Sequence, residues 1–304
     1  MRDELCKSLV KISSNKNMIF LTGDLGYSAL EPLKNKLKER FINAGVAEQN
    51  MIGVAAGLAS EGMDPWVYSI APFCYARPFE QIRNDIAFHN LPVKLLGNGG
   101  GYGYGVMGPT HHAIEDYGIL LTLPNFTIYL PCFNEDIESI IKLSNSNSCP
   151  TYIRLGYDES EASYYPESFK QWRLITKGNG PIVIVAGPLA TTLIEYFQNI
   201  EFKKRPNFWV LSKLPITKKT MPKELINQIK LKKNIYIIEE HVEHGGVASQ
   251  LSLLFNQMNL QPKKLMNLYA KSHHFSKYGS QKFLRKKSGI DLCSIIKLLN
   301  NDSQ

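Results

Sequence analysis

The sequence predicts an α/β protein of two doubly wound domains, each built on a mostly parallel sheet. Two observations lead to this fold class. Short apolar segments alternate with amphipathic ones throughout the chain, which is the element order of parallel strands joined by helical crossovers. The apolar segments are also continuous, as in Ile182–Ala186, with no polar residue at every second position. Strands of that kind are buried on both faces of a sheet.

The elements divide into two sets separated by a polar, tyrosine-rich stretch. We predict a first domain over 1–160, a linker over 161–180 and a second domain over 181–304. Strands of the first domain are expected at 18–21, 40–42, 66–69, 93–96, 126–129 and 151–155, and helices at 1–16, after residue 45, and at 77–88, 113–121 and 135–143. In the second domain we expect strands at 182–186, 208–211, 235–238 and 265–268, with helices at 190–199, 223–230, 246–257 and 290–299.

Composition excludes several classes of function. The net charge is +8 over 304 residues, and its basic pairs lie late in the chain without an aromatic-studded groove or a known nucleic-acid module, so we expect no nucleic-acid partner. Five scattered cysteines without a C-x-x-C pair indicate reduced thiols. The first ten residues lack a signal-peptide core, and no apolar run is long enough to span a membrane. These features predict a cytoplasmic protein that does not contact membranes.

The chain is organised around the stretch that runs from Phe41 to Ala59. After Asn43-Ala44-Gly45 a helix is predicted, with Met51, Val54, Ala55 and Leu58 on one buried face. Its first turn carries one acid, Glu48. An acid there commonly complements the helix dipole, so Glu48 taken alone does not indicate a site.

Residues at other strand ends are expected to lie near this stretch, because ligands of parallel sheets bind at the carboxyl ends of strands. Phe73 follows one predicted strand and is either a core residue or a platform for a ligand. The glycine-rich loop 97–108 follows another and contains a formal G-x-G-x-x-G. The next strand does not end in an acid, which disfavours a nicotinamide site.

Two histidines follow the glycine-rich loop. His111 and His112 are adjacent, so they cannot share one helical face as paired metal ligands would, and we expect no metal site in this chain. A role for His111 in hydrogen bonding or proton transfer is the stronger interpretation. His112 is expected to be a hydrogen-bonded residue at the helix start.

Taken together, these segments resemble a known family. The segments are G-D-L-x-x-S at 23–28, R-F-I-N-A-G-V-A-E-Q-N at 40–50, Y-S-I-A-P-F at 68–73, Q-I-R-N-D-I-A-F-H-N-L-P-V at 81–93, G-P-T-H-H-A-I-E-D at 108–116 and E-E-H-x-x-x-G-G at 239–246. In this order they are similar to the C-terminal half of transketolase, its pyrimidine-binding domain followed by its C-terminal domain. Deoxyxylulose-phosphate synthase and the beta subunits of 2-oxoacid dehydrogenases share this layout. The resemblance covers nearly the whole chain.

The resemblance implies thiamine diphosphate as cofactor. Glu48 matches the catalytic glutamate that shares a proton with N1′ of the aminopyrimidine, and Phe73 matches the aromatic residue that stacks on it. Asp24 and Leu25 match positions on the thiazolium side of the cofactor. The second catalytic residue implied is His111, which matches the histidine that faces the reacting ketol group.

The substrate site is implied in the same way. Ser28 and Arg154 match positions that hold a substrate phosphate, and a guanidinium suits that role because it binds phosphate oxygens bidentately. Typical transketolases carry a histidine early in the glycine-rich loop and an aspartate before G-P-T-H. Here about Gly99 and Met107 stand in those places. We therefore expect an anionic sugar substrate that differs from the usual ketose phosphates.

One motif of the family is missing. The G-D-G…N-N motif for diphosphate and magnesium does not occur, so the sequence resembles the second subunit of a split transketolase. Such a subunit implies a partner chain that carries the diphosphate-binding domain and the magnesium ligands, with an α2β2 heterotetramer as the expected assembly. Two alternatives stay open: a decarboxylating relative, of the deoxyxylulose-phosphate synthase or oxoacid dehydrogenase type, and a non-catalytic binding subunit.

Overall fold

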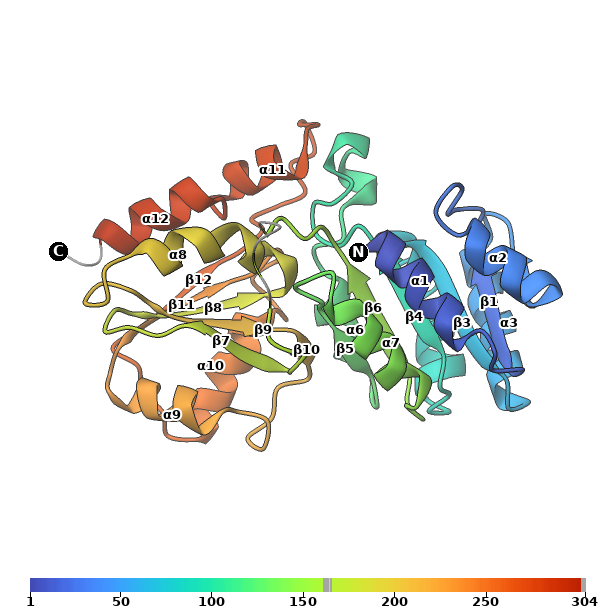
Figure 1. The fold of residues 1–304 in the computed structure, drawn as a ribbon, viewed down its shortest axis with the longest axis horizontal. Helices are drawn as coiled ribbons and strands as arrows, with labels where there is room; N and C mark the ends of the chain where they lie inside the picture. The colour runs from blue at the N-terminus through green and yellow to red at the C-terminus, as the bar shows by residue number, and fades with distance from the viewer. Residues whose placement is uncertain (161–163, 165, 302–304) are drawn as a thin grey trace.

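The computed structural model describes residues 1–160, 164 and 166–301. Two sheets, each with helices on both faces, lie beside one another along the molecule (Figure 1). The first sheet has the order β10-β5-β6-β4-β3-β1-β2 and the second the order β12-β11-β8-β9-β7. Each sheet is parallel except for one antiparallel strand at an edge, β10 in the first and β7 in the second. The predicted fold class is confirmed.

The strands of the first sheet that belong to the first half of the chain are β1 (Met18–Thr22), β2 (Phe41–Asn43), β3 (Asp64–Ile70), β4 (Lys94–Asn98), β5 (Thr127–Tyr129) and β6 (Thr151–Leu155). Its main helices are α1 (Arg2–Ile12), α2 (Glu31–Leu37), α3 (Glu48–Ser60), α4 (Ala71–Tyr75), α5 (Phe79–Gln81), α6 (Asp116–Leu120) and α7 (Asp136–Asn145). Short turns of 3-10 helix lie at Lys38–Arg40, Gly105–Met107 and Pro109–His111, and a π-helical turn lies at Ile82–Ala87.

The strands of the second half are β7 (Trp172–Thr176), β8 (Ile182–Ala186), β9 (Asn207–Leu211), β10 (Lys213–Leu214), β11 (Asn234–Ile238) and β12 (Lys264–Leu268). Its helices are α8 (Ile194–Asn199), which continues the 3-10 turn Gly187–Leu193, then α9 (Lys223–Lys230), α10 (Val247–Gln257), α11 (Gln281–Ser288) and α12 (Leu292–Asn301). In Figure 1, α8, α11 and α12 cover one face of the second sheet, and α9 and α10 the other.

Several segments differ from the sequence-based prediction: α2, β10 and α11 are not predicted, and three other segments have different bounds or a different structure. The range 161–180 is predicted to be a linker, but β7 lies inside it and pairs with β9, so the second domain begins before residue 181. Residues 161–163 and 165 of that predicted linker lie outside the described residues. The helix predicted at 77–88 begins only at Phe79, after Pro78, and is π-helical from Ile82 to Ala87. The helix predicted from Ala113 begins only at Asp116.

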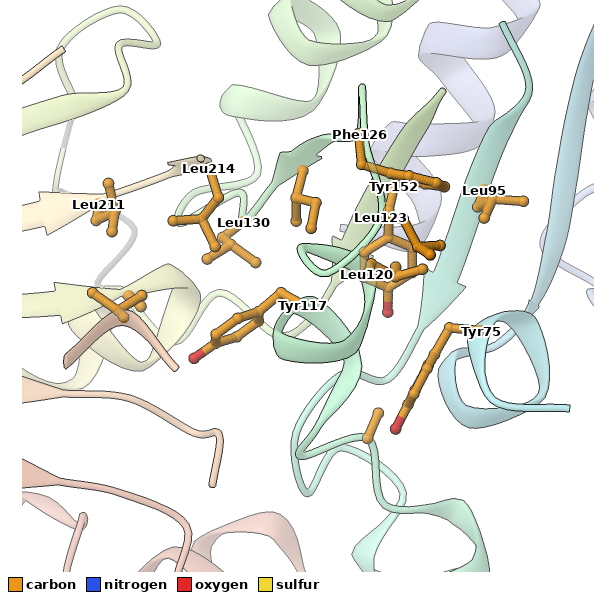
Figure 2. Packing of buried hydrophobic residues seen from close by; sticks show 14 of the residues in the cluster. Tyr75, Leu95, Tyr117, Leu120, Leu123, Phe126, Leu130, Tyr152, Leu211 and Leu214 are labelled. Atoms are coloured by element: carbon orange, nitrogen blue, oxygen red, sulfur yellow. The ribbon is translucent and has the colours of Figure 1, made fainter. Parts of the chain in front are cut away.

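The hydrophobic core continues from one domain into the other. Leu211 and Leu214 of the second half pack in the same cluster as Tyr117 and Leu130 of the first, as Figure 2 shows. Apolar burial of this kind stabilises an interface by roughly 25 cal/mol per Å². The two domains therefore meet through a shared core, which fixes the loops of both at their junction.

Candidate active site

Glu48 is the first residue of α3, and the chain path places it at the carboxyl end of the first sheet. β1 and β2 pair in parallel with Thr22 opposite Asn43, and Ala44 N–H donates to the Thr22 carbonyl. Gly45 then turns the chain with φ +69°, a conformation that residues with a side chain rarely adopt. The carboxylate that follows is only 5% exposed. A buried acid needs a partner.

The partner of Glu48 is Arg77, which lies beyond the end of α4. Arg77 Nη1 donates to Glu48 Oε1 at 2.9 Å. The same guanidinium lies over the ring of Phe73, with Cζ 3.8 Å from the ring centroid. The imidazole of His111 meets that ring edge-on, with centroids 5.0 Å apart. The structure therefore brings together three of the predicted site residues, Glu48, Phe73 and His111, and adds Arg77.

An open pocket of about 360 Å³ lies beside this cluster. Its lining comprises Val46, Ala47, Glu48, Gln49, Asn50 and Arg77. Val54, predicted to face the core, is instead 42% exposed on the same helix, whereas Met51 and Ala55 are buried as expected. The outer face of α3 thus stays open to solvent next to the carboxylate.

His111 has an environment that favours its neutral form. Burial, with the nearby positive charge of Arg77, lowers the pKa of its imidazole below the usual value. The Thr110 hydroxyl lies 3.0 Å from Nδ1, which orients the ring. A neutral imidazole at this place can accept or donate a single proton.

The loop with Asp24 and Leu25 is joined to the end of β2, the strand that precedes α3. Asn43 donates from its amide nitrogen to Asp24 Oδ1 at 2.8 Å, and Tyr27 donates its hydroxyl to the same oxygen at 2.9 Å. These bonds lower the pKa of the Asp24 carboxyl. Leu25 is held through Thr22, whose hydroxyl donates to the Leu25 carbonyl at 2.8 Å.

Ser28 lies further along this loop, at an exposed position with φ +64°. Its backbone N–H donates to Glu31 Oε1 at 2.7 Å. This bond ties Ser28 to Glu31 and does not place it beside Glu48, Phe73 or His111. Its assignment to the substrate site stays a prediction.

The glycine-rich loop is packed against the second domain. Tyr102 N–H donates to Glu240 Oε1 at 2.8 Å, and the N–H of Gly279 reaches the Gly105 carbonyl at 3.4 Å. Gly99 has φ +72°, and a Cβ added there would lie 2.2 Å from the ring of Tyr104. A larger residue at position 99 is therefore strongly disfavoured. Met107, near the end of the loop, is 55% exposed.

Arg154 is placed differently from what a phosphate contact requires. Its Nε lies 3.1 Å from Asp116 Oδ2, and its Nη2 donates to the carbonyls of Ala113 and Glu240 at 2.9 and 2.7 Å. The residue is only 6% exposed. The guanidinium that the sequence predicts to hold a substrate phosphate is thus enclosed by protein atoms where the domains meet. Its observed contacts are structural, and they give no support to a phosphate role for Arg154.

Sequence reasoning missed a histidine cluster between the domains. His112 and His273 stack with ring centroids 5.7 Å apart, and His273 Nε2 lies 2.5 Å from Glu115 Oε1. His112 is 2% exposed and neither of its ring nitrogens has a hydrogen-bond partner among the described residues, contrary to the prediction. Burial, together with His273 and His274, lowers its pKa to about 4. The adjacent histidines at 273–274 are the sequence feature that could have indicated this cluster.

The E-E-H segment at 239–241 also contributes side chains to the junction between the two domains. Glu239 accepts hydrogen bonds from the Tyr117 hydroxyl at 2.7 Å and from the N–H groups of Val247 and Ala248 at 2.6 and 3.1 Å.

Among the residues that the structure describes, no three His, Cys, Asp or Glu side chains gather as metal ligands would. In the same part of the chain, no helix combines the length and the hydrophobicity that crossing a bilayer requires.

Comparison with known proteins adds an independent observation. Residues 10–159 match the model of the family described as transketolase, pyrimidine binding domain. The chain is 29% identical over 272 residues to the B subunit of apulose-4-phosphate transketolase from Actinobacillus succinogenes, a match that covers 88% of this chain and 86% of that protein. It is also 29% identical over 289 residues to 1-deoxy-D-xylulose-5-phosphate synthase of Desulfotalea psychrophila, but spans only 44% of that longer protein.

A solved structure gives the same result for the fold. A split-gene transketolase, described as an inactive β4 tetramer, superimposes with a TM-score of 0.82 at 26% identity. The match covers 99% of this chain and 97% of that one. The similarity therefore extends through both sheets and their junction.

Proposed function

Since residues 10–159 are a transketolase pyrimidine-binding domain and the whole chain has the fold of the C-terminal half of transketolase, we propose that this protein is one subunit of a thiamine diphosphate-dependent transferase. The complete enzyme would move a ketol unit between sugar phosphates. The observation that carries the proposal is the buried carboxylate of Glu48 next to an open pocket. Arg77 connects it to the ring of Phe73, and the edge of that ring meets the imidazole of His111.

These residues suit the aminopyrimidine half of the cofactor. A flat heteroaromatic ring with a basic nitrogen needs an acid and an aromatic face, and Glu48 and Phe73 offer both. When bound, thiamine diphosphate supplies an electron sink for breaking and forming the carbon–carbon bond next to a carbonyl. The hydrogen bond between Asn43 and Asp24 holds the neighbouring loop against the end of β2, five residues before Glu48.

In this proposal each residue of the chain has a definite task. Glu48 holds a proton at N1′ of the pyrimidine, and its burial keeps water from competing for that proton. Phe73 fixes the plane of the ring. His111, neutral near pH 7, takes or gives a proton at a hydroxyl or carbonyl oxygen of the sugar.

The other half of the site is proposed to come from a partner chain. The G-D-G…N-N motif is missing from this sequence, and the relative from Actinobacillus succinogenes, which is of similar length, is by name one subunit of its transketolase. We propose a cytoplasmic α2β2 heterotetramer, in which the partner supplies the diphosphate site and the magnesium ligands. By analogy with that relative, the substrate is a sugar phosphate.

A decarboxylating reaction is the second candidate, because the chain matches 1-deoxy-D-xylulose-5-phosphate synthase over 93% of its own length. The two reactions differ in one product, because only the decarboxylating reaction releases carbon dioxide. The chain should be assembled with its partner and given a ketose phosphate donor with an aldose phosphate acceptor, or pyruvate with the same acceptor. Ketol transfer without carbon dioxide supports the transferase, and carbon dioxide release supports the alternative.

The test of the site itself uses Glu48→Gln. The amide cannot hold the proton at N1′, so exchange of the cofactor C2 proton in the assembled complex should slow by orders of magnitude. Assembly and the far-ultraviolet circular dichroism spectrum should be unchanged. An unaltered exchange rate would remove Glu48 from the mechanism and overturn the proposal, and a non-catalytic role for the chain would then gain support.

A further inference from the structure

The side chain of Arg77 contacts the two groups that the proposed function assigns to the pyrimidine. Its Nη1 donates to the carboxylate of Glu48 at 2.9 Å, and its Cζ lies 3.8 Å above the centroid of Phe73. One planar group therefore makes a hydrogen bond to the acid and stacks on the ring at van der Waals distance.

A guanidinium and an aminopyrimidine have much in common as ligands of such a pair. Both are flat and delocalised, both carry N–H donors in their plane, and both stack on aromatic faces. A pyrimidine that reaches Glu48 while it lies on Phe73 enters the space that the guanidinium fills. The carboxylate that has to share a proton with the cofactor is bonded to a cation instead.

The surroundings of Arg77 allow its side chain to leave this position. Its side chain is 46% exposed, whereas that of Glu48 is 5% exposed. It lies just beyond the C-terminal end of α4 and precedes Pro78, in the break before α5. Its hydrogen bond to Glu48 and its ring contact with Phe73 are the interactions that hold it there within the described residues. Rotation of the side chain towards solvent thus costs one charge-assisted hydrogen bond and one cation–π contact, with no change in a helix.

We propose that Arg77 is an internal substitute for the aminopyrimidine, which occupies the site in the free subunit and is displaced when the cofactor binds. The inference rests on the proposed function, since it needs Glu48 and Phe73 to be the pyrimidine ligands. It assigns Arg77 the role of a gating residue: cofactor affinity is set by a competition between a side chain and the ligand. Removal of the side chain must therefore tighten binding, the opposite of what a cofactor contact would do.

The experiment compares Arg77→Ala with wild type and with Arg83→Ala. Arg83 is an exposed arginine on the π-helical turn just after α5, so its loss changes the net charge equally. The pyrimidine fragment 4-amino-5-hydroxymethyl-2-methylpyrimidine is titrated into the isolated chain by ligand-observed NMR. Thiamine diphosphate with magnesium is titrated into the assembled complex by calorimetry.

In both titrations we expect Arg77→Ala to bind about tenfold more tightly than wild type, which corresponds to about 1.4 kcal/mol. Arg83→Ala should match wild type. Arg77→Lys keeps the charge but loses the planar fork, and its affinity should lie between those of wild type and Arg77→Ala. Thermal unfolding of each variant checks that the fold is kept.

Equal or weaker binding by Arg77→Ala, in a complex whose wild type binds the cofactor, would overturn the gating role and leave the proposed function intact. Failure of the wild-type complex to bind thiamine diphosphate at all would overturn both. The two outcomes are distinguished within the same calorimetric series.

Discussion

Nε of Arg154 lies 3.1 Å from Oδ2 of Asp116, and neither side chain is more than 7% exposed. Burial raises the pKa of the Asp116 carboxyl, while Arg154 and the Tyr152 hydroxyl oppose that rise. Two further bonds from Arg154 reach backbone carbonyls, one of them in the second domain. This buried ion pair stands at the junction that supports the glycine-rich loop.

We therefore expect Arg154→Met to destabilise the protein. Removal of one partner of a buried ion pair leaves an uncompensated charge, at a cost of about 3–5 kcal/mol. Urea unfolding followed by circular dichroism measures the free energy. The double variant with Asp116→Asn should recover part of the loss. Unchanged stability together with a raised KM for a phosphorylated substrate would instead return Arg154 to the substrate site.

The chain alone should bind thiamine diphosphate poorly. Glu48 and Phe73 offer contacts to the pyrimidine, but the sequence lacks the family motif for the diphosphate and magnesium. Calorimetry of the isolated chain with cofactor and magnesium is expected to show no micromolar site, and addition of the partner chain should create one. Micromolar binding by the isolated chain would contradict the requirement for a partner.

Stability should fall in mild acid because of His241. Burial lowers its pKa to about 4, and its two nitrogens are already engaged: Gly118 N–H donates to Nε2 at 3.1 Å, and Nδ1 lies 2.8 Å from the Val242 carbonyl. The folded pKa lies below the unfolded value near 6.5. The stabilisation is thus fully present above pH 6.5 and is lost progressively as the pH falls towards 4, on the order of 3 kcal/mol in all.

Urea unfolding at pH 7.5, 6 and 5 measures this dependence. His241→Gln is the matched variant, because its amide oxygen can accept from Gly118 without titrating. The difference in unfolding free energy between the two proteins should change most between pH 6 and 5. A difference that is constant with pH would show that His241 does not titrate on unfolding.

Donor choice should depend on Met107. A thioether cannot accept a hydrogen bond from a sugar hydroxyl as a carboxylate does, and Met107 is exposed near the end of the glycine-rich loop. The wild-type complex should be slow with xylulose 5-phosphate, and Met107→Asp should raise kcat/KM by about tenfold, which one charge-assisted hydrogen bond of about 1.5–3 kcal/mol can supply. Val106→Asp, next to it and also exposed, is the control.

Steady-state rates of the three complexes decide this question. Fast wild-type turnover, or an equal gain from both aspartates, would show that residue 107 does not select the donor. The second departure from the family, at about Gly99, cannot be reversed in the same way, since a side chain there meets the ring of Tyr104.

Periodicity and strand composition are sufficient to predict the two parallel sheets, because buried strands such as β1 and β8 consist almost entirely of apolar residues. They do not predict α11 and β10, whose positions depend on partners far along the chain. Strand β7 resembles a linker in the sequence because polar residues flank it. Residue 54 of α3 is predicted to lie in the core, since a helical apolar spacing does not say which face is covered.

Some residues of the candidate site can likewise be predicted from the sequence, and others cannot. Glu48, Phe73 and His111 follow three strand ends of one sheet, so the rule for parallel sheets is enough to bring them together. Arg154 also sits at a strand end, but its environment is decided by Asp116 and by a carbonyl from the second domain. Arg77 carries no motif of its own, and only its contacts indicate a role.

Strand β10 has a consequence for how the chain is made. Residues 213–214 pair with Tyr129 and Ile128 and so close the outer side of β5. When the ribosome has delivered the first 160 residues, β5 is still a bare edge with unpaired N–H and C=O groups, the kind of surface that recruits strands from other molecules. A chain truncated at the domain boundary would keep that edge permanently. We therefore expect a newly made chain to be prone to aggregation at this edge until residues 213–214 have been synthesised and supply the missing strand.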